Sequence, residues 1–125
     1  MTRDEAESFA AQWAGWWNAG DVEQVLAQFS DDTVFTSPTA ADVVGTGTVR
    51  GKEALRAYWT AALKRIGSLH FTVDRIVWDP ERRELAIIYT SRTAGKAKRM
   101  SENFHFGANG KIIAAEVFHG VSPAG

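Results

Sequence analysis

The sequence contains no cysteine, which excludes disulfide bonds, thiolate catalysis and cysteine-ligated zinc sites. Its charge is nearly balanced, with 14 Lys and Arg against 15 Asp and Glu. Without a basic excess the chain has no general attraction for nucleic acid or anionic lipid, so we expect neither as a partner. A membrane-spanning helix needs about 20 consecutive apolar residues, and every apolar run in this chain is far shorter. The acidic N-terminus also lacks the apolar stretch of a secretory signal. These features predict a soluble, cytoplasmic protein.

The 125 residues are 45% hydrophobic and 23% charged, an ordinary globular balance. No repeat, low-complexity run or linker interrupts them. A chain of this length buries roughly two-thirds of its unfolded surface, enough for one real core. We therefore expect a single domain over residues 1–125.

Helical patterns fill the first half of the chain. Thr2 and Glu5 fit a capping box, followed by aromatic residues at helical spacing and a stop at Gly20. Asp21 can cap a short second helix with its apolar face over residues 22–29. The clearest helix covers residues 53–66, where apolar residues recur every three or four positions. Residues 39–50 are small, polar and glycine-containing, and we interpret them as a mobile loop or a loose strand pair.

Strand patterns dominate the second half. A first strand is predicted at residues 33–36, closed by Pro38. Later segments follow a period of two: 69–73, 76–78, 85–92, 98–106 and 112–119. Asn109-Gly110 is a strong hairpin signal between the last two. Helices followed by sequentially paired strands indicate an α+β fold with an antiparallel sheet.

Apolar side chains occupy both faces of two late strands. Ile87 and Tyr89 alternate with Ala86 and Ile88, and the last strand shows the same pattern. One layer of helices covers only one face of a sheet. The outer face must then be buried as well, which predicts a homodimer through that face.

Four segments resemble the nuclear transport factor 2-like superfamily, in its SnoaL-like and ketosteroid-isomerase-like branches. They are Asn18–Asp21, Asp31–Val34, Gly51 before the long helix, and Asn103–Ile113. The resemblance implies a cone-shaped, curved antiparallel sheet wrapped on three N-terminal helices, the cystatin-like roll. It also implies a deep apolar pocket and usually a dimer.

The isomerase residues carry over only in part. The aspartate base that precedes a proline in the isomerases corresponds here to Ser37, and an unpartnered serine is no general base at neutral pH. The oxyanion-donating tyrosine corresponds to Trp13, and the supporting tyrosine of the long helix to Trp59. The protonated acid corresponds to Glu102. The resemblance therefore implies a pocket but argues against the standard steroid isomerase mechanism.

The last hairpin gives an inference that is independent of the family. A two-residue turn at Asn109-Gly110 pairs Glu102 with Val117 and Met100 with His119. A loop of odd length would instead turn the partner strand over. With the two-residue turn, one face holds a mostly apolar set: Met100, Glu102, Phe104, Phe106, Ile113, Ala115, Val117 and His119.

Glu102 and His119 are the candidate catalytic residues. They lie diagonally across the hairpin, roughly 5–8 Å apart. An apolar pocket should raise the pKa of Glu102. The carboxyl group could then donate to a carbonyl oxygen, act as a base, or orient the imidazole. The alternative is a structural Glu102 that hydrogen-bonds to an indole or a tyrosine.

Aromatic and apolar residues from several elements are candidates for a ligand pocket, with core packing as the alternative role. The candidate substrate-binding residues are Trp13, Phe35, Ser37, Tyr58, Trp59, Tyr89, Met100, Phe104 and Val117. No metal-ligand motif is present, so we expect neither a metal nor a cofactor. Lys96, Lys98 and Arg99 form a short basic patch, interpreted as a solvated hairpin end.

Two functions remain open from the sequence. The first is a small-molecule pocket with acid–base chemistry of isomerase, cyclase, dehydratase or hydrolase type at Glu102. The second is a non-catalytic ligand-binding or dimerisation module on the same fold. In either case residues 39–50 could form a lid at the pocket mouth.

Overall fold

The computed structural model describes residues 1–123, which form four helices and six strands. The helices are α1 (Arg3–Asn18), α2 (Val22–Leu26), α3 (Pro38–Val44) and α4 (Lys52–Ile66). The strands are β1 (Phe29–Thr36), β2 (Thr48–Arg50), β3 (Leu69–Asp79), β4 (Glu84–Thr93), β5 (Lys96–Phe106) and β6 (Ile112–His119).

Local signals fix the ends of the first helices as expected. The Thr2 side chain accepts from the backbone N–H of Glu5 at 3.1 Å, and the Glu5 carboxylate accepts from the Thr2 N–H at 2.7 Å. These two bonds satisfy N–H groups that the first helical turn leaves free. Asp21 caps α2 through the N–H of Gln24 at 3.2 Å. Gly20 has a φ of 72°, the left-handed conformation that ends a helix cheaply.

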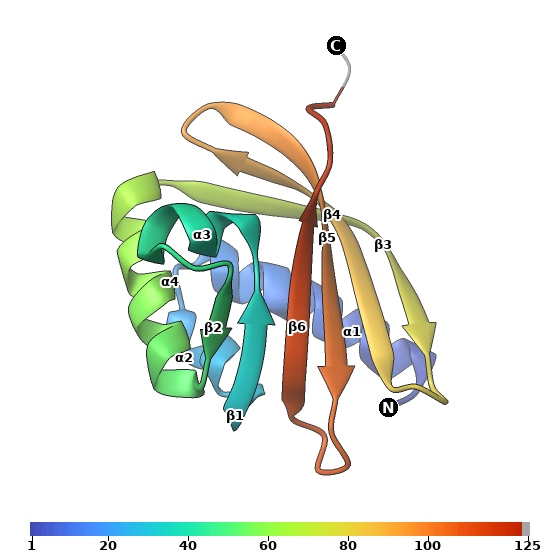
Figure 1. The fold of residues 1–125 in the computed structure, drawn as a ribbon. Coiled ribbons are helices and arrows are strands. Elements are labelled where there is room, and N and C mark those ends of the chain that lie inside the picture. Colours follow the sequence, from blue (N-terminus) through green and yellow to red (C-terminus); the bar gives the residue numbers. More distant parts are fainter. Residues whose placement is uncertain (124–125) are drawn as a thin grey trace.

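The strands form one curved sheet in the order β2-β1-β6-β5-β4-β3. Neighbouring strands run antiparallel except for β1 and β6, which are parallel. The parallel pair joins the first strand to the last, so it brings the two halves of the chain together. Figure 1 shows α1 lying across one face of the sheet, with α4 beside the β1 and β2 edge. The α+β class and the cystatin-like roll are thus confirmed.

Residues 39–50 were predicted to be a mobile loop or a loose strand pair, but they contain most of helix α3 and the single strand β2, which pairs with β1. Ser37 caps α3 and Pro38 occupies its first turn, a frequent helix start that the small, polar composition obscured. The second helix is also shorter than predicted. It ends at Leu26, and Phe29 already belongs to β1.

The predicted register of the last hairpin is confirmed over most of its length. Glu102 pairs with Val117 and Met100 with His119. The loop, however, spans five residues, because Phe106 pairs with Ile112. A bulge at Ile113 then restores the register that an odd loop would have lost. Ile113 was wrongly placed on the inner face: it is 37% exposed, whereas Ile112 is fully buried.

The core lies between the inner face of the sheet and the helices. It is largely aromatic, and its rings meet mostly edge to face, as aromatic pairs prefer. None of the helices within residues 1–123 is long and apolar enough to cross a membrane.

Candidate functional site

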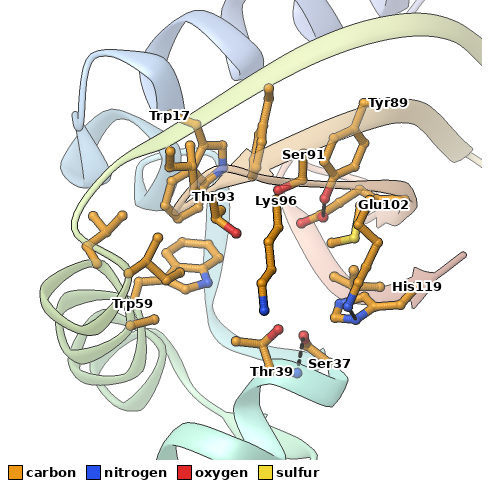
Figure 2. Close-up of a pocket in the computed structure, with 18 of the residues that line it drawn as sticks. Trp17, Ser37, Thr39, Trp59, Tyr89, Ser91, Thr93, Lys96, Glu102 and His119 are labelled. Atoms are coloured by element: carbon orange, nitrogen blue, oxygen red, sulfur yellow. Dashed lines mark hydrogen bonds between the residues drawn. The ribbon is translucent and has the colours of Figure 1, made fainter. Parts of the chain in front are cut away.

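A cavity of about 280 Å³ opens between α4, α3 and the inner faces of β4, β5 and β6 (Figure 2). Aromatic and aliphatic side chains make most of its wall, including Trp17, Trp59, Phe35 and Phe71. Side chains with hydroxyl or ionisable groups make the rest of the wall. They come from Ser37, Thr39, Tyr58, Tyr89, Ser91, Thr93, Lys96, Lys98, Glu102, His119 and Ser122.

Glu102 is a carboxyl group inside this apolar wall. Its side chain is only 5% exposed, and it lies on β5 beside Tyr89 of β4. The Tyr89 hydroxyl donates to Glu102 Oε1 at 2.8 Å. Within residues 1–123 this is the one hydrogen bond that reaches the carboxyl group. The second oxygen, Oε2, accepts no hydrogen bond from any residue within 1–123.

Two aromatic residues hold Tyr89 in place. The Trp13 ring meets the Tyr89 ring edge-on at 5.0 Å, and the Phe71 ring lies 4.7 Å from it. Tyr89 is almost fully buried, so its ring has little freedom to turn. The position of the phenol, and with it the orientation of Glu102, is thus set by packing from α1 and β3.

Burial controls the protonation of this pair. Loss of solvent raises the pKa of Glu102 from 4.5 to about 7, although the Tyr89 hydrogen bond acts to lower it. Burial, followed by the charge of Glu102, raises the pKa of Tyr89 well above its usual value. Tyr89 therefore stays a hydrogen-bond donor, whereas Glu102 changes charge near neutral pH.

His119 lines the same cavity but has a different partner from the one expected. Its Nδ1 lies 3.4 Å from Lys98 Nζ, and an ammonium group can only donate. Nδ1 is then the acceptor and Nε2 carries the ring proton. Burial and the charge of Lys98 lower the pKa of His119, against a smaller opposing effect of Asp42. The imidazole is therefore neutral, and its buried Nε2–H has no acceptor within residues 1–123.

Ser37, which occupies the position of the isomerase aspartate base, has a structural role in this protein. Its hydroxyl oxygen accepts from the Thr39 N–H at 3.2 Å and caps α3. Burial raises the pKa of the nearby Tyr58 hydroxyl, with the hydroxyls of Ser37 and Thr39 acting in the opposite direction. No carboxylate or imidazole bonds to Ser37 within residues 1–123, so nothing activates it as a base or nucleophile.

All but two of the predicted substrate-binding residues line the cavity: Phe35, Ser37, Tyr58, Trp59, Tyr89, Met100 and Val117. Trp13 and Phe104 do not. They belong to the core beneath it, where Trp13 packs against Tyr89 and Phe104 against Phe9. Whether the lining residues contact a ligand stays a prediction.

Several lining residues were not predicted. Lys96 and Lys98 were interpreted as a solvated hairpin end, yet both border the cavity. The signal was available in the alternation of β5, since Lys96 and Lys98 share the face of Met100 and Glu102. Trp17 also lines the cavity, and its buried indole N–H lacks an acceptor within residues 1–123. No cluster of three or more histidine or acidic side chains in this range could hold a metal ion.

Comparison with known families now identifies the fold family. The SnoaL-like domain profile matches residues 10–115, most of the chain. The chain belongs to the SnoaL-like family. It lies within the nuclear transport factor 2-like superfamily, as the sequence resemblance implied.

Solved structures agree with this assignment. A SnoaL-like protein of unknown function from Burkholderia thailandensis is 31% identical and superimposes with a TM-score of 0.84, covering 95% of this chain and 97% of its own. A cystatin-like protein of unknown function from Methylobium petroleophilum is 27% identical with a TM-score of 0.77, covering 99% and 81%. SalBIII, an epoxide hydrolase/cyclase-like enzyme in pyran ring formation in salinomycin, is 17% identical with a TM-score of 0.73, covering 94% and 92%. At that identity SalBIII shares the fold alone. No curated protein matches the chain.

Proposed function

We propose that this SnoaL-like protein binds a small apolar or aromatic molecule in its cavity and that Glu102 exchanges a proton with it. The observation that carries the proposal is a buried carboxyl group, with one hydrogen bond and one free oxygen, on the wall of an apolar cavity. A buried acid of this kind destabilises a fold whenever it ionises. Such costly groups concentrate at functional sites.

The protonation behaviour of Glu102 suits acid–base chemistry. With a pKa of about 7, both its acid and base forms are populated at neutral pH. Proton transfer is most efficient when the pKa of the catalytic group lies near the working pH. Chemistry of isomerase, cyclase, dehydratase or hydrolase type is consistent with such a group. The standard steroid isomerase mechanism is not, because Ser37 replaces its base.

The size of the cavity limits the ligand. An apolar cavity of about 150 Å³ holds one benzene ring. The volume here, about 280 Å³, suits a molecule of about two rings. The residues proposed to contact it include Trp59, Tyr58 and Val117.

His119 has a supporting role in this proposal. As a neutral imidazole with its proton on Nε2, it can donate a hydrogen bond but is a poor acid. The Nε2–H group is buried and lacks an acceptor within residues 1–123, and we propose that the imidazole ring turns to donate this N–H to a carbonyl oxygen in the cavity. Stabilising negative charge on that oxygen would make a neighbouring C–H proton easier for Glu102 to remove.

Exchange of the α-protons of 2-tetralone in D2O tests the proposal, because this ketone has two fused rings and acidic C–H groups. NMR would follow the exchange with wild type, Glu102→Gln and Glu81→Gln. Glu81 is an exposed acid on the β3–β4 turn and controls for the loss of a carboxylate. We expect Glu102→Gln to slow exchange by about 100-fold or more and Glu81→Gln to leave it unchanged. Equal exchange by wild type and Glu102→Gln, or none above buffer with wild type, contradicts the proposal.

A second candidate function is ligand binding without catalysis. The Tyr89 hydrogen bond to Glu102 favours it, because a structural acid would also be paired with a tyrosine. Under this alternative 2-tetralone would quench the fluorescence of Trp17 and Trp59, which line the cavity, yet its protons would not exchange.

We also propose a homodimer through the outer face of the sheet. Val77 and Phe118 are 58% and 55% exposed on this side, although both are large and apolar. Outer-face residues of β1 and β3 to β6 line a shallow hollow there. Light scattering at micromolar concentration should give twice the chain mass of 13.7 kDa, and Phe118→Glu should reduce it to one chain. A monomeric wild type contradicts the dimer. A cytoplasmic location stays a prediction.

A further inference from the structure

The side chains on the inner face of β5 change along the strand from positively charged to apolar and then to acidic. From the hairpin end inward it carries Lys96, Lys98, Met100 and Glu102, and all four side chains line the cavity. Lys96 and Lys98 are exposed, whereas Glu102 is buried. The cavity therefore has a positively charged mouth, an apolar middle and a titratable inner end.

The two ammonium groups lack carboxylate partners. Within residues 1–123 no carboxylate oxygen lies within 4.0 Å of Lys96 Nζ or Lys98 Nζ, although the other cationic side chains of this sheet region, such as Arg99 and Arg75, pair with Asp74. In the described part of the chain, the one close polar contact of the Lys98 ammonium group is His119 Nδ1, a neutral acceptor. Asp42 of α3 is near enough to influence His119 but does not pair with either lysine. Among residues 1–123, the positive charge at the mouth thus has no carboxylate counterion.

The lysines are also directed at the cavity rather than away from it. Figure 2 shows Lys96 extended from the β4–β5 hairpin with its ammonium group pointing toward Thr39 and Ser37 across the cavity. Hydroxyl groups of Thr39 and Thr93 line the same region. Ammonium and hydroxyl donors together are suited to a carboxylate, whose two oxygens accept several hydrogen bonds.

We propose that the ligand of this cavity is an amphipathic carboxylate: a body of about two rings, inserted among the aromatic walls, with its anionic group at Lys96 and Lys98. This inference rests on the proposed small-molecule site and adds its substrate class. Lys96 and Lys98 lie nearer to the β4–β5 hairpin than Met100 and Glu102 do on the same face of β5. The carboxylate is therefore expected at the hairpin end of the cavity and the reacting carbon at its Glu102 end.

Two matched probes test the charge requirement. Naphthalene-2-carboxylate is anionic, and naphthalene-2-carboxamide has nearly the same shape without the charge. Binding would be measured by calorimetry at pH 6.0, where Glu102 is mostly protonated, with wild type, Lys96→Met, Lys98→Met and the double variant. Lys64→Met is the control, because Lys64 is an exposed lysine of α4 that does not line the cavity. It changes the net charge by the same amount.

We expect each lysine variant to weaken carboxylate binding about 2- to 5-fold, the range for exposed ion pairs, and the double variant about 10-fold. Amide binding should stay constant in all variants, and Lys64→Met should change neither probe. Equal affinity for both probes, with no effect of the lysines, overturns the inference but leaves proton exchange at Glu102 intact. If wild type binds neither probe at millimolar concentration, the small-molecule site itself is contradicted, and both proposals fail together.

Discussion

Replacing Glu102 with glutamine should remove a specific pH dependence from the stability of the fold. Glutamine has nearly the same shape and can still accept from the Tyr89 hydroxyl, but it never ionises. The wild-type carboxyl group has a pKa of about 7 when folded and 4.5 when solvated. The comparison therefore isolates the cost of ionising one buried group.

The direction of this pH dependence is set by whether the folded or the unfolded chain binds the Glu102 proton more tightly. Because the folded pKa of Glu102 is the higher one, the folded protein holds this proton more tightly than the unfolded chain. Its stabilising effect is complete below about pH 4.5 and is lost as pH rises through about 7. The difference between a pKa of 4.5 and one of about 7, at 1.36 kcal/mol for each factor of ten in proton affinity, corresponds to about 3 kcal/mol.

Urea unfolding of wild type and Glu102→Gln between pH 4 and pH 8.5 measures this effect. The difference between the two free energies of unfolding cancels the other ionisable groups. We expect that difference to move by about 3 kcal/mol in favour of Glu102→Gln across the range. If the difference between the two free energies of unfolding changes by less than about 0.5 kcal/mol over the whole pH range, the pKa of Glu102 is not raised, and the acid–base role that depends on it is refuted.

Two further substitutions test the supporting residues. Tyr89→Phe removes the hydrogen bond that favours ionised Glu102, so the pKa of Glu102 should rise above about 7 by roughly one unit or more. Carbon-13 NMR titration of the glutamate carboxyls would show it, and an unchanged or lower pKa would contradict the pairing. Ser37→Ala removes the cap of α3 and should lower the free energy of unfolding by about 1 kcal/mol, whereas Ser37→Asp should retain it. Equal stability of Ser37→Ala and wild type in urea would show that the cap contributes nothing.

Much of the fold could be predicted because local signals agreed with it. The capping box at Thr2 and Glu5, the apolar stripe of residues 53–66 and the register that pairs Glu102 with Val117 all appear in the structure. The parallel pairing of β1 with β6 could not be read from local patterns, because it joins residues about 80 positions apart. The bulge at Ile113 was likewise hidden, since it depends on how the loop closes.

The candidate site was predictable to the extent that strand alternation determines it. Alternation places Glu102, Met100 and His119 on one face, and the cavity lies on that face. The sequence could not predict which aromatic residues line the cavity and which belong to the hydrophobic core. Trp13 and Trp17 are one turn apart on α1, yet only Trp17 reaches the cavity. That choice depends on the tilt of α1 over β3, which is a property of tertiary packing.

As pH rises through the pKa of Glu102, we expect proton removal by this residue to become faster and the free energy of unfolding to fall. Ionised Glu102 is the form that can remove a proton, and it is also the form that destabilises the fold. A site that retains a buried acid at this cost is consistent with selection for chemistry over stability.

The pH profile of 2-tetralone proton exchange tests the central claim most directly. If Glu102 is the base, the exchange rate catalysed by wild type should rise with pH, with a midpoint of about 7, and level off above it. A midpoint near 4.5, or the same profile in Glu102→Gln, would contradict the assignment of the chemistry to Glu102.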